Sequence, residues 1–288
     1  MASELKTRIE EAAAHVRGRT SVRPQVGVIL GTGLGDFADA LRIETVVPYQ
    51  EIPHFPCSTV ESHASELHLG TLSGRPVAIM KGRVHYYEGY RMEQVAFPVR
   101  VLMALGCPTV IITNAVGGMT PSMPAGTLVV TTDHINLMGD NPLIGVNDET
   151  LGPRFPDMSE PYSRALIALA ERAASGLRIP LQRAVFVGVA GPNLETAAEY
   201  RFLRGIGADV VGMSLVPEVI AAVHGGQRVL SFNVVTDTCQ PDDLRPVSIP
   251  EILRVAGNMA PTLIRLVTEV VRRLEEAIEE RLSPAENR

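Results

Sequence analysis

A cationic and aromatic cluster occupies residues 80–90, MKGRVHYYEGY, directly after an apolar segment that is predicted to be a strand. Strand-like alternation places Arg83, His85 and Tyr87 on one side, which brings together a planar cation, a switchable donor and a phenol. A single Arg or His is more often structural than functional. Three such groups at one strand end favour a site that holds an anion beside a polar ligand.

A glycine-rich turn follows the predicted strand in residues 26–36, VGVILGTGLGD. Thr32 stands between two glycines, so its hydroxyl and the neighbouring backbone amides can meet a phosphate. The segment does not fit a dinucleotide fingerprint, because Asp36 replaces the third glycine of that motif, and no Gly-Lys-Ser/Thr triplet for a P-loop occurs. A tight structural turn is an equally good interpretation of this segment alone.

Two further turns carry small groups that can approach an anion. In residues 113–118, TNAVGG, the glycines allow close approach of the backbone, so the Ala115 amide is a candidate donor. Ser214 lies where a predicted strand in residues 208–219, ADVVGMSLVPEV, meets a helix, a junction at which small polar groups commonly contact phosphates. A plain turn explains the first of these segments equally well.

Two carboxylates stand at predicted strand ends. Glu195 follows the apolar run that opens residues 189–200, VAGPNLETAAEY, and Asp237 ends the run in residues 231–240, SFNVVTDTCQ. Helix capping explains Glu195, and a turn explains Asp237, when each is taken alone. Because both carboxylates stand at strand ends, the interpretation that they bind a ligand is as good as the interpretation that each caps a local element. No G-x-S-x-G or H-E-x-x-H motif occurs, so covalent and metal catalysis are poorly supported, and no metal or cofactor is expected.

The elements that must position these groups alternate between strands and helices. Several predicted strands are continuous apolar runs, which is typical of strands covered on both faces. The predicted helices carry apolar residues at spacings of three and four. The pattern predicts an α/β fold with a largely parallel sheet flanked by helices. The strands are expected at residues 26–30, 77–80, 110–113, 128–131, 185–189, 210–213 and 229–235, and the helices at residues 92–105, 163–174, 196–203, 218–224 and 251–282.

No linker, repeat or low-complexity block divides the chain, so residues 1–288 are predicted to form a single domain. An N-terminal helix is expected over residues 1–20, and the tail, residues 283–288, is expected to be frayed. Residues 138–161 form a long irregular stretch, rich in proline and glycine. A connection of that length inside a compact fold is usually functional or interfacial.

The composition excludes several classes of protein. A net charge of -6 with scattered basic residues gives no footprint for nucleic-acid binding. The three cysteines, Cys57, Cys107 and Cys239, lie far apart without zinc spacing, which fits a reduced cytoplasmic protein. The N-terminus lacks the apolar core of a signal peptide, and no stretch reaches membrane-spanning length, so no membrane partner is expected.

The motifs above belong to a longer ordered set that covers about residues 25 to 240: GTGLG, EIPHFPCSTVESHA, GRVHYYEGY, FPVRVLMALG, TNAVGGM, DHINLMGDNPL, RFPDMSE, VAGPNLETAAE and VGMSLVPEV. This set closely resembles the trimeric purine nucleoside phosphorylases, a family that includes the methylthioadenosine phosphorylases. The resemblance implies one α/β domain with a central mixed sheet, a homotrimer, and a pentosyltransferase activity. The reaction is the reversible phosphorolysis of purine (deoxy)ribonucleosides to free base and (deoxy)ribose 1-phosphate, with inorganic phosphate as co-substrate and no cofactor.

The resemblance also implies a role for each marked residue. Asp237, His85 and Glu195 are the candidate catalytic residues, and Asp237 stands where the family contacts purine N7 as the base departs. By similarity, phosphate would contact Thr32, Arg83, His85, the Ala115 amide and Ser214; the nucleoside would contact Tyr87, the Met213 backbone, Leu194, Glu195, Val211, Asp237, Ile249 and, from the neighbouring subunit of the trimer, Phe155.

Two departures from the family pattern leave the substrate open. An ionised Asp237 can only accept, which suits the 6-amino group of adenine, whereas Glu195 matches a residue that accepts from N1–H of a 6-oxopurine. A protonated Asp237 would reconcile the two, since burial raises the pKa of a carboxyl. Ile249 or Pro250 replaces a histidine near the ribose 5′ position, which favours tolerance of a 5′-alkylthio group.

Three alternatives therefore accompany the general purine activity, which Glu195, Ser214 and Phe155 favour. The first is a methylthioadenosine phosphorylase. The second is a hydrolytic nucleosidase, which Arg83 and His85 disfavour because water needs no anion site. The third is a non-catalytic nucleotide-binding module, which the intact set of anion donors disfavours.

Overall fold

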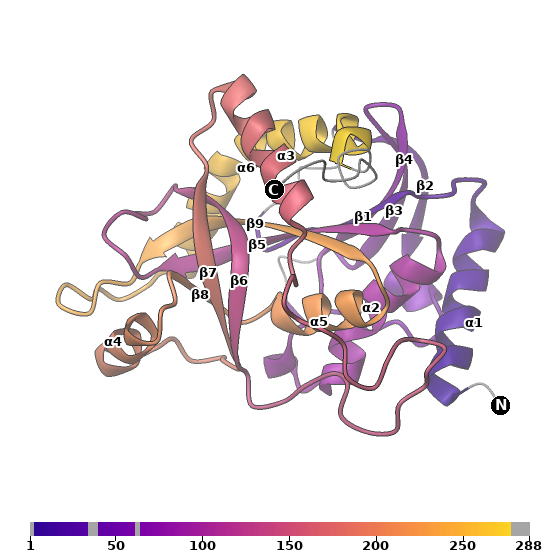
Figure 1. Ribbon diagram of the computed structural model, residues 1–288, viewed down its shortest axis with the longest axis horizontal. Coiled ribbons are helices and arrows are strands. Elements are labelled where there is room, and N and C mark those ends of the chain that lie inside the picture. The colour runs from indigo at the N-terminus through magenta and orange to yellow at the C-terminus, as the bar shows by residue number, and fades with distance from the viewer. Residues whose placement is uncertain (1–2, 34–39, 61–63, 278–288) are drawn as a thin grey trace, which may run out of the picture.

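The computed structural model describes residues 3–33, 40–60 and 64–277, and it places their strands in one nine-stranded sheet (Figure 1). The strand order is β2-β3-β4-β1-β5-β8-β7-β6-β9, and a further pairing of β5 with β9 closes the last five strands into a ring. The strands are β1 (Val26–Ile29), β2 (Arg42–Pro48), β3 (Glu66–Leu72), β4 (Arg75–Lys81), β5 (Thr109–Gly118), β6 (Leu128–Leu137), β7 (Gln182–Val189), β8 (Val210–Gly212) and β9 (Arg228–Thr238).

The sheet is mixed, as expected. Five of the nine pairings between described strands are parallel and four are antiparallel. The central strands are buried on both faces, and all four residues of β1 are inaccessible to solvent. This burial is the reason why these strands appear in the sequence as continuous apolar runs rather than alternating ones. The predicted α/β architecture is confirmed.

Helices cover both faces of the sheet (Figure 1). On one face α3 packs against α6, while on the other α2 packs against α5, with α1 against the outer side of α2. The long helix α6 turns an apolar side inward, where Leu263, Leu266 and Val270 are fully buried. The helices are α1 (Glu4–Arg19), α2 (Met92–Ala104), α3 (Arg164–Leu177), α4 (Ala197–Gly205), α5 (Val216–His224) and α6 (Ile249–Arg272), with short 3-10 helices η2 (Tyr49–Glu51) and η3 (Tyr86–Glu88).

The structure departs from the expected elements in two places. The strands β2 and β3 were not expected. The first is largely exposed, and its sequence, RIETVVP, shows no continuous apolar run. The second is mostly buried, but His68 and Gly70 interrupt its apolar residues. Helix α6 begins two residues earlier than expected and ends at Arg272. Arg273 leaves the helical conformation with φ -98° and ψ 11°, and residues 274–277 are helical again. The residues from 278 onward, including the tail at 283–288, lie outside the described residues.

Four neighbouring strands determine where a site can form. The strands β4, β1, β5 and β9 are pairwise parallel in that order, so their carboxyl ends meet at one edge of the sheet. Thr32 follows β1, Arg83 follows β4, and Ala115 and Asp237 lie in the last part of β5 and β9. Ligands of α/β proteins commonly bind at the carboxyl ends of parallel strands.

Candidate active site

A cavity of about 520 Å³ lies at this edge of the sheet. Residues from distant parts of the chain share it, and its wall is partly apolar with convergent polar groups, the usual form of a small-molecule pocket. Of the thirteen predicted site residues, twelve line the cavity: Thr32, Arg83, His85, Tyr87, Ala115, Leu194, Glu195, Val211, Met213, Ser214, Asp237 and Ile249.

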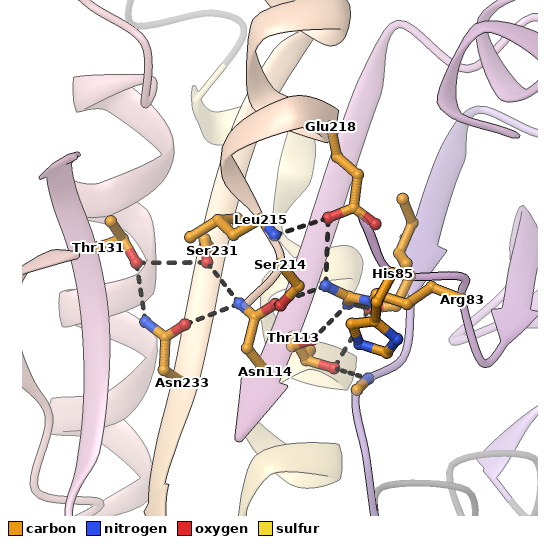
Figure 2. A network of polar contacts seen from close by, with 12 residues as sticks. Arg83, His85, Thr113, Asn114, Thr131, Ser214, Leu215, Glu218, Ser231 and Asn233 are labelled. Atoms are coloured by element: carbon orange, nitrogen blue, oxygen red, sulfur yellow. Dashed lines mark hydrogen bonds and ion pairs between the residues drawn. The ribbon is translucent and has the colours of Figure 1, made fainter. Parts of the chain in front are cut away.

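Arg83 is a buried cation in the wall of the cavity, with 3% of its surface exposed. Its terminal nitrogens donate to Asn114 Oδ1 at 2.6 Å, Glu218 Oε2 at 3.1 Å, the Thr113 carbonyl at 2.6 Å and the Ile29 carbonyl at 3.3 Å. Burial lowers the pKa of Arg83, and the Glu218 carboxylate opposes that shift. Its Nε–H has no partner among the described residues. The protein therefore fixes both the charge and the orientation of this guanidinium (Figure 2).

Asn114 connects Arg83 to a buried polar network that crosses the sheet (Figure 2). Its Oδ1 accepts from Arg83 and, at 3.1 Å, from the Ser214 hydroxyl. Its Nδ2 donates to Asn233 Oδ1 at 2.7 Å, and Asn233 Nδ2 donates to Thr131 at 2.8 Å. Because an unsatisfied buried polar group is costly, this network fixes the amide of Asn114 and, through it, the Ser214 side chain.

Leu215, at the start of α5, lies next to Ser214 in an unusual conformation. Its φ is 67°, in the left-handed region that a branched residue seldom adopts. The Leu215 N–H donates to Glu218 Oε2 at 3.0 Å, the same oxygen that pairs with Arg83. Glu218 therefore joins the entry of α5 to the buried cation and helps to hold Leu215 in this conformation.

His85 is held by Glu88, the last residue of η3. Glu88 Oε1 accepts from the His85 backbone N–H at 2.7 Å and lies 3.1 Å from His85 Nδ1. Burial disfavours the charged carboxylate, but hydrogen bonds from His85 and Thr59 prevail and lower the pKa of Glu88 to about 2. The two contacts of the Glu88 carboxylate fix the orientation of the His85 ring at the cavity wall.

Tyr87 stacks on His85, with ring centroids 4.8 Å apart and an interplanar angle of 14°. Burial raises the pKa of Tyr87 to about 12, so the phenol keeps its proton at neutral pH. The sequence predicts that strand alternation places His85 and Tyr87 on one side. That prediction is wrong, because β4 ends at Lys81, before either residue. The tight turn of η3 brings His85 and Tyr87 together instead.

Asp237 lies within β9, so the interpretation that it merely ends a strand in a turn does not hold. Its Oδ1 accepts from the Thr236 hydroxyl at 2.9 Å, and its Oδ2 accepts from the Cys239 thiol at 3.0 Å. Both contacts are side chain to side chain. The carboxylate of Asp237 is therefore oriented by its neighbours at the wall of the cavity rather than used to cap the backbone.

Glu195 precedes α4 but does not cap it. Thr196 and Glu199 form the capping box, in which the Thr196 N–H donates to Glu199 Oε2 at 2.7 Å and the Glu199 N–H donates to Thr196 Oγ1 at 3.3 Å. Burial raises the pKa of Glu195, a hydrogen bond from Tyr200 opposes the shift, and the negative charge of Asp237 adds to it. The capping interpretation of Glu195 is wrong, and its carboxyl is available to the cavity.

The register of β5 and β9 sets the distance between the Ala115 amide and Asp237. Ala115 pairs with Val234, and Gly117, two positions further along β5, pairs with Asp237. Two residues of extended strand span about 7 Å. The cavity therefore has room for a small molecule that presents an anion at one end and polar ring atoms at the other.

Phe155 is the predicted site residue that does not line the cavity. It is 87% exposed, and the Arg154 guanidinium lies 5.8 Å from the centroid of its ring. The irregular stretch at residues 138–161 also exposes Ile144 and Val146. An apolar patch of this kind on a surface loop is typical of a contact region.

Several residues contribute to the site without having been marked in the sequence: Asn114, Glu218, Glu88, Tyr200 and Cys239. All five stand inside the segments quoted above, so a polar side chain near a marked residue was the available signal. That signal did not show which side chain each of them contacts, because several of these contacts join distant segments.

Two negative findings concern residues 3–33, 40–60 and 64–277. They contain no group of three or more His, Cys, Asp or Glu side chains arranged to hold a metal ion. No helix in the same ranges combines the length and apolar character needed to cross a membrane.

Comparisons with known proteins place the chain in a family. The model of the phosphorylase superfamily matches residues 25–272. The chain is 48% identical to purine nucleoside phosphorylase 1 of Bacillus subtilis over 271 residues, which cover 94% of this chain and 100% of that protein. Two solved structures of Schistosoma mansoni purine nucleoside phosphorylase are each 37% identical. The complex with inosine has a TM-score of 0.88 and covers 93% of this chain and 96% of that one; the complex with adenosine has a TM-score of 0.86 and covers 93% and 97%.

Proposed function

This chain belongs to the phosphorylase superfamily and is a purine nucleoside phosphorylase, and we propose that its cavity binds phosphate at one end and the purine at the other. The enzyme catalyses the reversible phosphorolysis of purine nucleosides to the free base and pentose 1-phosphate. One observation carries the proposal for the cavity. Both the anion donors and the two carboxyls line it, and Ala115 lies about 7 Å along β5 from Gly117, which pairs with Asp237.

At the phosphate end, we assign Thr32, His85 and the Ala115 amide as donors. The Ser214 hydroxyl, which donates to Asn114 Oδ1 at 3.1 Å here, joins them by turning its O–H to the bound phosphate. The guanidinium of Arg83 contributes a fixed positive charge nearby. Its terminal N–H groups already donate to protein acceptors, so the Nε–H is the donor left for a direct bond to phosphate. Because the charge is buried, its attraction for an anion is screened less than it would be at the surface.

The chemistry requires positioning more than activation. Phosphate is a modest nucleophile, and the site holds it beneath the anomeric carbon of the sugar. As the glycosidic bond breaks, its electron pair moves to the purine and positive charge develops on the sugar, where the phosphate dianion stabilises it. The purine leaves more readily when N7 takes up a proton, which water in the open cavity supplies. We assign one oxygen of Asp237 as the acceptor of that N7–H, while its other oxygen faces position 6.

At the purine end, Glu195 and Asp237 set the hydrogen-bonding pattern. An ionised Glu195 accepts from the N1–H of a 6-oxopurine, and a protonated Asp237 donates to O6. The converse states fit a 6-aminopurine, whose N1 accepts and whose 6-amino group donates. Complexes of the Schistosoma relative with inosine and with adenosine support a site of this kind that admits both classes.

A second substrate class, the 5′-alkylthio nucleosides, is favoured by the wall near the start of α6. Ile249, Ile252 and Leu253 line the cavity there, and no histidine stands at the beginning of the helix. An apolar wall accepts a methylthio group without leaving a polar atom unpaired. We therefore expect the enzyme to cleave methylthioadenosine in addition to the common nucleosides.

The position of Phe155 supports a shared site in a trimer. The side chain is exposed on its own subunit and lies outside its own cavity, so it is available to a neighbour. This assignment is tested by co-expressing subunits that carry Phe155→Ala with subunits that carry Asp237→Ala. Each variant alone is expected to be weakly active, and the mixed enzyme is expected to recover activity, because some sites then have both side chains. No recovery would contradict the shared site.

The central experiment measures free base from inosine, guanosine, adenosine and methylthioadenosine, with and without phosphate. Release that depends on phosphate is expected for all four, with pentose 1-phosphate as the second product. Release without phosphate would instead indicate a hydrolytic nucleosidase. Asp237→Asn is expected to shift preference toward 6-oxopurines, because the amide always donates to O6. An unchanged substrate ratio would show that Asp237 does not contact position 6.

A further inference from the structure

His224, the last residue of α5, contacts the irregular stretch at residues 138–161, which runs beside this helix (Figure 1). Its Nε2 lies 3.3 Å from Asn147 Oδ1 in that stretch, and its Nδ1 lies 3.2 Å from Arg100 Nη1 in α2. His224 and Arg100 are buried, with 4% and 3% of their surfaces exposed. His224 therefore joins a buried cation to the loop that carries Phe155.

The partners of His224 determine where its proton lies. A guanidinium has only donors, so Nδ1 of His224 accepts from Arg100, and the proton of the neutral ring is on Nε2, which donates to Asn147 Oδ1. The Asn147 amide is oriented to match, because its Nδ2 donates to Glu149 Oε1 at 2.8 Å and to the Gly152 carbonyl at 3.1 Å. Each of these protons has its own acceptor. The contacts are satisfied together when the His224 ring is neutral.

The backbone of Gly152 packs directly on His224. A Cβ added at Gly152 would lie 2.8 Å from both Nδ1 and Cε1 of the His224 ring, and closer still to the His224 carbonyl oxygen. Only a glycine allows this approach. Since Asn147 also holds the Gly152 carbonyl, His224 and Asn147 together fix the course of the chain three residues before Phe155.

Arg154 connects this region to Phe155. Its Nη1 donates to the Leu143 carbonyl at 3.1 Å and to the Gly145 carbonyl at 2.8 Å, which closes the stretch on itself. Its guanidinium lies 5.8 Å from the centroid of the Phe155 ring. Contacts within a loop fix its shape, whereas a contact with the packed helices fixes its position. His224 makes such a contact from α5.

Resting on the shared site proposed above for Phe155, we propose that His224 is a positioning residue, whose neutral ring holds the loop so that Phe155 reaches the nucleoside pocket of the neighbouring subunit. His224 is not among the residues that line the cavity of its own subunit. Its effect on the reaction passes through Asn147 and Gly152 to Phe155, and so to a site on another subunit.

A second proton on His224 would break this arrangement. The new N–H at Nδ1 would point at the Arg100 guanidinium, which has no acceptor, and two buried positive charges would meet. Burial and the Arg100 charge lower the pKa of His224 from its usual 6.5. The backbone of residues 152–153 and the Glu149 carboxylate oppose that shift. The groups that act on the ring thus come from α2 and from the loop itself. The loop is held at neutral pH and is expected to be released as the pH falls below 6.5.

Two substitutions of His224 separate its contacts. His224→Gln places an amide N–H near the position of Nε2, so the donor to Asn147 remains, and the amide does not titrate. His224→Asn keeps an acceptor near Nδ1 for Arg100 but is too short to reach Asn147. At neutral pH we expect His224→Asn and Asn147→Ala to raise KM for inosine about tenfold, the effect of losing one buried hydrogen bond. The KM for phosphate is expected to stay unchanged, and His224→Gln is expected to keep the wild-type KM for inosine.

A pH series adds a readout that a merely structural role would not move. The ratio of KM for inosine in the wild type to that in His224→Gln is expected to rise as the pH falls below 6.5, because only the wild type loses the contact with Asn147. Groups that titrate in both enzymes cancel in this ratio. His68→Gln is the matched control, since His68 is a buried histidine of β3, 5% exposed, that contacts Glu66. It is expected to keep the pH profile of the wild type.

The position of Phe155 can also be followed without turnover. The chain contains no tryptophan, so Phe155→Trp supplies a single reporter in the loop. Its fluorescence emission is expected to move to longer wavelength as the pH falls below 6.5, because the indole leaves the neighbouring pocket for water. Adding His224→Gln is expected to abolish this change. The same emission change with and without His224→Gln would overturn the proposal.

The mixed-subunit experiment separates this inference from the shared site on which it rests. If mixing Phe155→Ala with Asp237→Ala subunits restores activity while His224→Asn and Asn147→Ala keep the wild-type KM for inosine, only the role of His224 is refuted. If mixing restores no activity, the shared site itself fails, and the role of His224 fails with it. Should His224→Asn not fold, the pH profiles of the wild type and His224→Gln decide, and identical profiles overturn the proposal.

Discussion

The buried ion pair of Arg83 and Glu218 gives a prediction that joins stability to phosphate binding. Their side chains are 3% and 4% exposed, and their closest N and O atoms are 3.1 Å apart. At an effective dielectric constant of about 20, this distance corresponds to an attraction of about 5 kcal/mol. Glu218→Gln keeps an oxygen that accepts from Arg83 and from Leu215 but removes the negative charge, so Arg83 becomes an uncompensated buried cation.

We expect Glu218→Gln to lower the free energy of unfolding by about 3 kcal/mol, near the lower end for breaking a buried pair, because the hydrogen bonds remain. In a chain of this size the loss corresponds to a fall in Tm of about 6 °C. Saturating phosphate is expected to raise the Tm of the variant more than that of the wild type, because the bound anion supplies the missing charge.

Thermal unfolding with and without phosphate measures both effects. Glu275→Gln, which removes the partner of Arg75 from a pair whose glutamate is 70% exposed, is the control and is expected to change Tm little. An unchanged Tm in Glu218→Gln would show that the pair contributes nothing net to stability. An equal effect of phosphate on wild type and variant would refute the reasoning that Arg83 acts on phosphate as a fixed charge.

Three further predictions concern the cavity. In Gly117→Ala the added Cβ would lie 2.6 Å from Cys239 Sγ and 3.3 Å from Asp237 Oδ2. We expect kcat/KM to fall roughly a hundredfold while the circular dichroism spectrum is retained. Wild-type kinetics in this variant would show that the crowding does not disturb the site. The pKa of Glu88 is lowered from 4.5 to about 2, so its ionised form stabilises the fold above about pH 4.5, and that contribution is lost as the pH falls toward 2. The urea midpoint of Glu88→Gln is expected to lie below that of the wild type at neutral pH and to converge with it in acid. A difference that stays constant with pH would argue against this linkage. Ile249→His is expected to raise the ratio of kcat/KM for inosine to kcat/KM for methylthioadenosine about tenfold, as measured by base release. An unchanged ratio would show that the start of α6 does not contact the 5′ group.

Much of the fold and of the cavity wall could be predicted from the sequence. Continuous apolar runs identified the buried strands, because a strand covered on both faces must be apolar throughout. The strand ends carried the polar groups, and parallel strands bring such ends to one edge. The exposed strand β2 was missed for the same physical reason, since a strand that is largely exposed carries no apolar run.

The partners of these groups could not be predicted. Glu195 and Asp237 each had a local explanation as a cap or a turn residue, and only the packed chain shows that Thr196 and Glu199 cap α4 and that Asp237 bonds Thr236 and Cys239. Local sequence also suggested the wrong reason for the convergence of His85 and Tyr87, which the turn of η3 produces.

By itself, the sequence determined which chemical groups this enzyme has and in which order they follow the strands, because strand burial and turn chemistry are local properties of neighbouring residues. Only the tertiary structure decided which of those groups hold one another. Arg83 meets Glu218 across 135 positions of the chain, and Tyr200 of α4 packs in one buried apolar cluster with Cys239, which follows β9. Such contacts depend on sheet register and helix packing, which are fixed by long-range burial and not by any single segment.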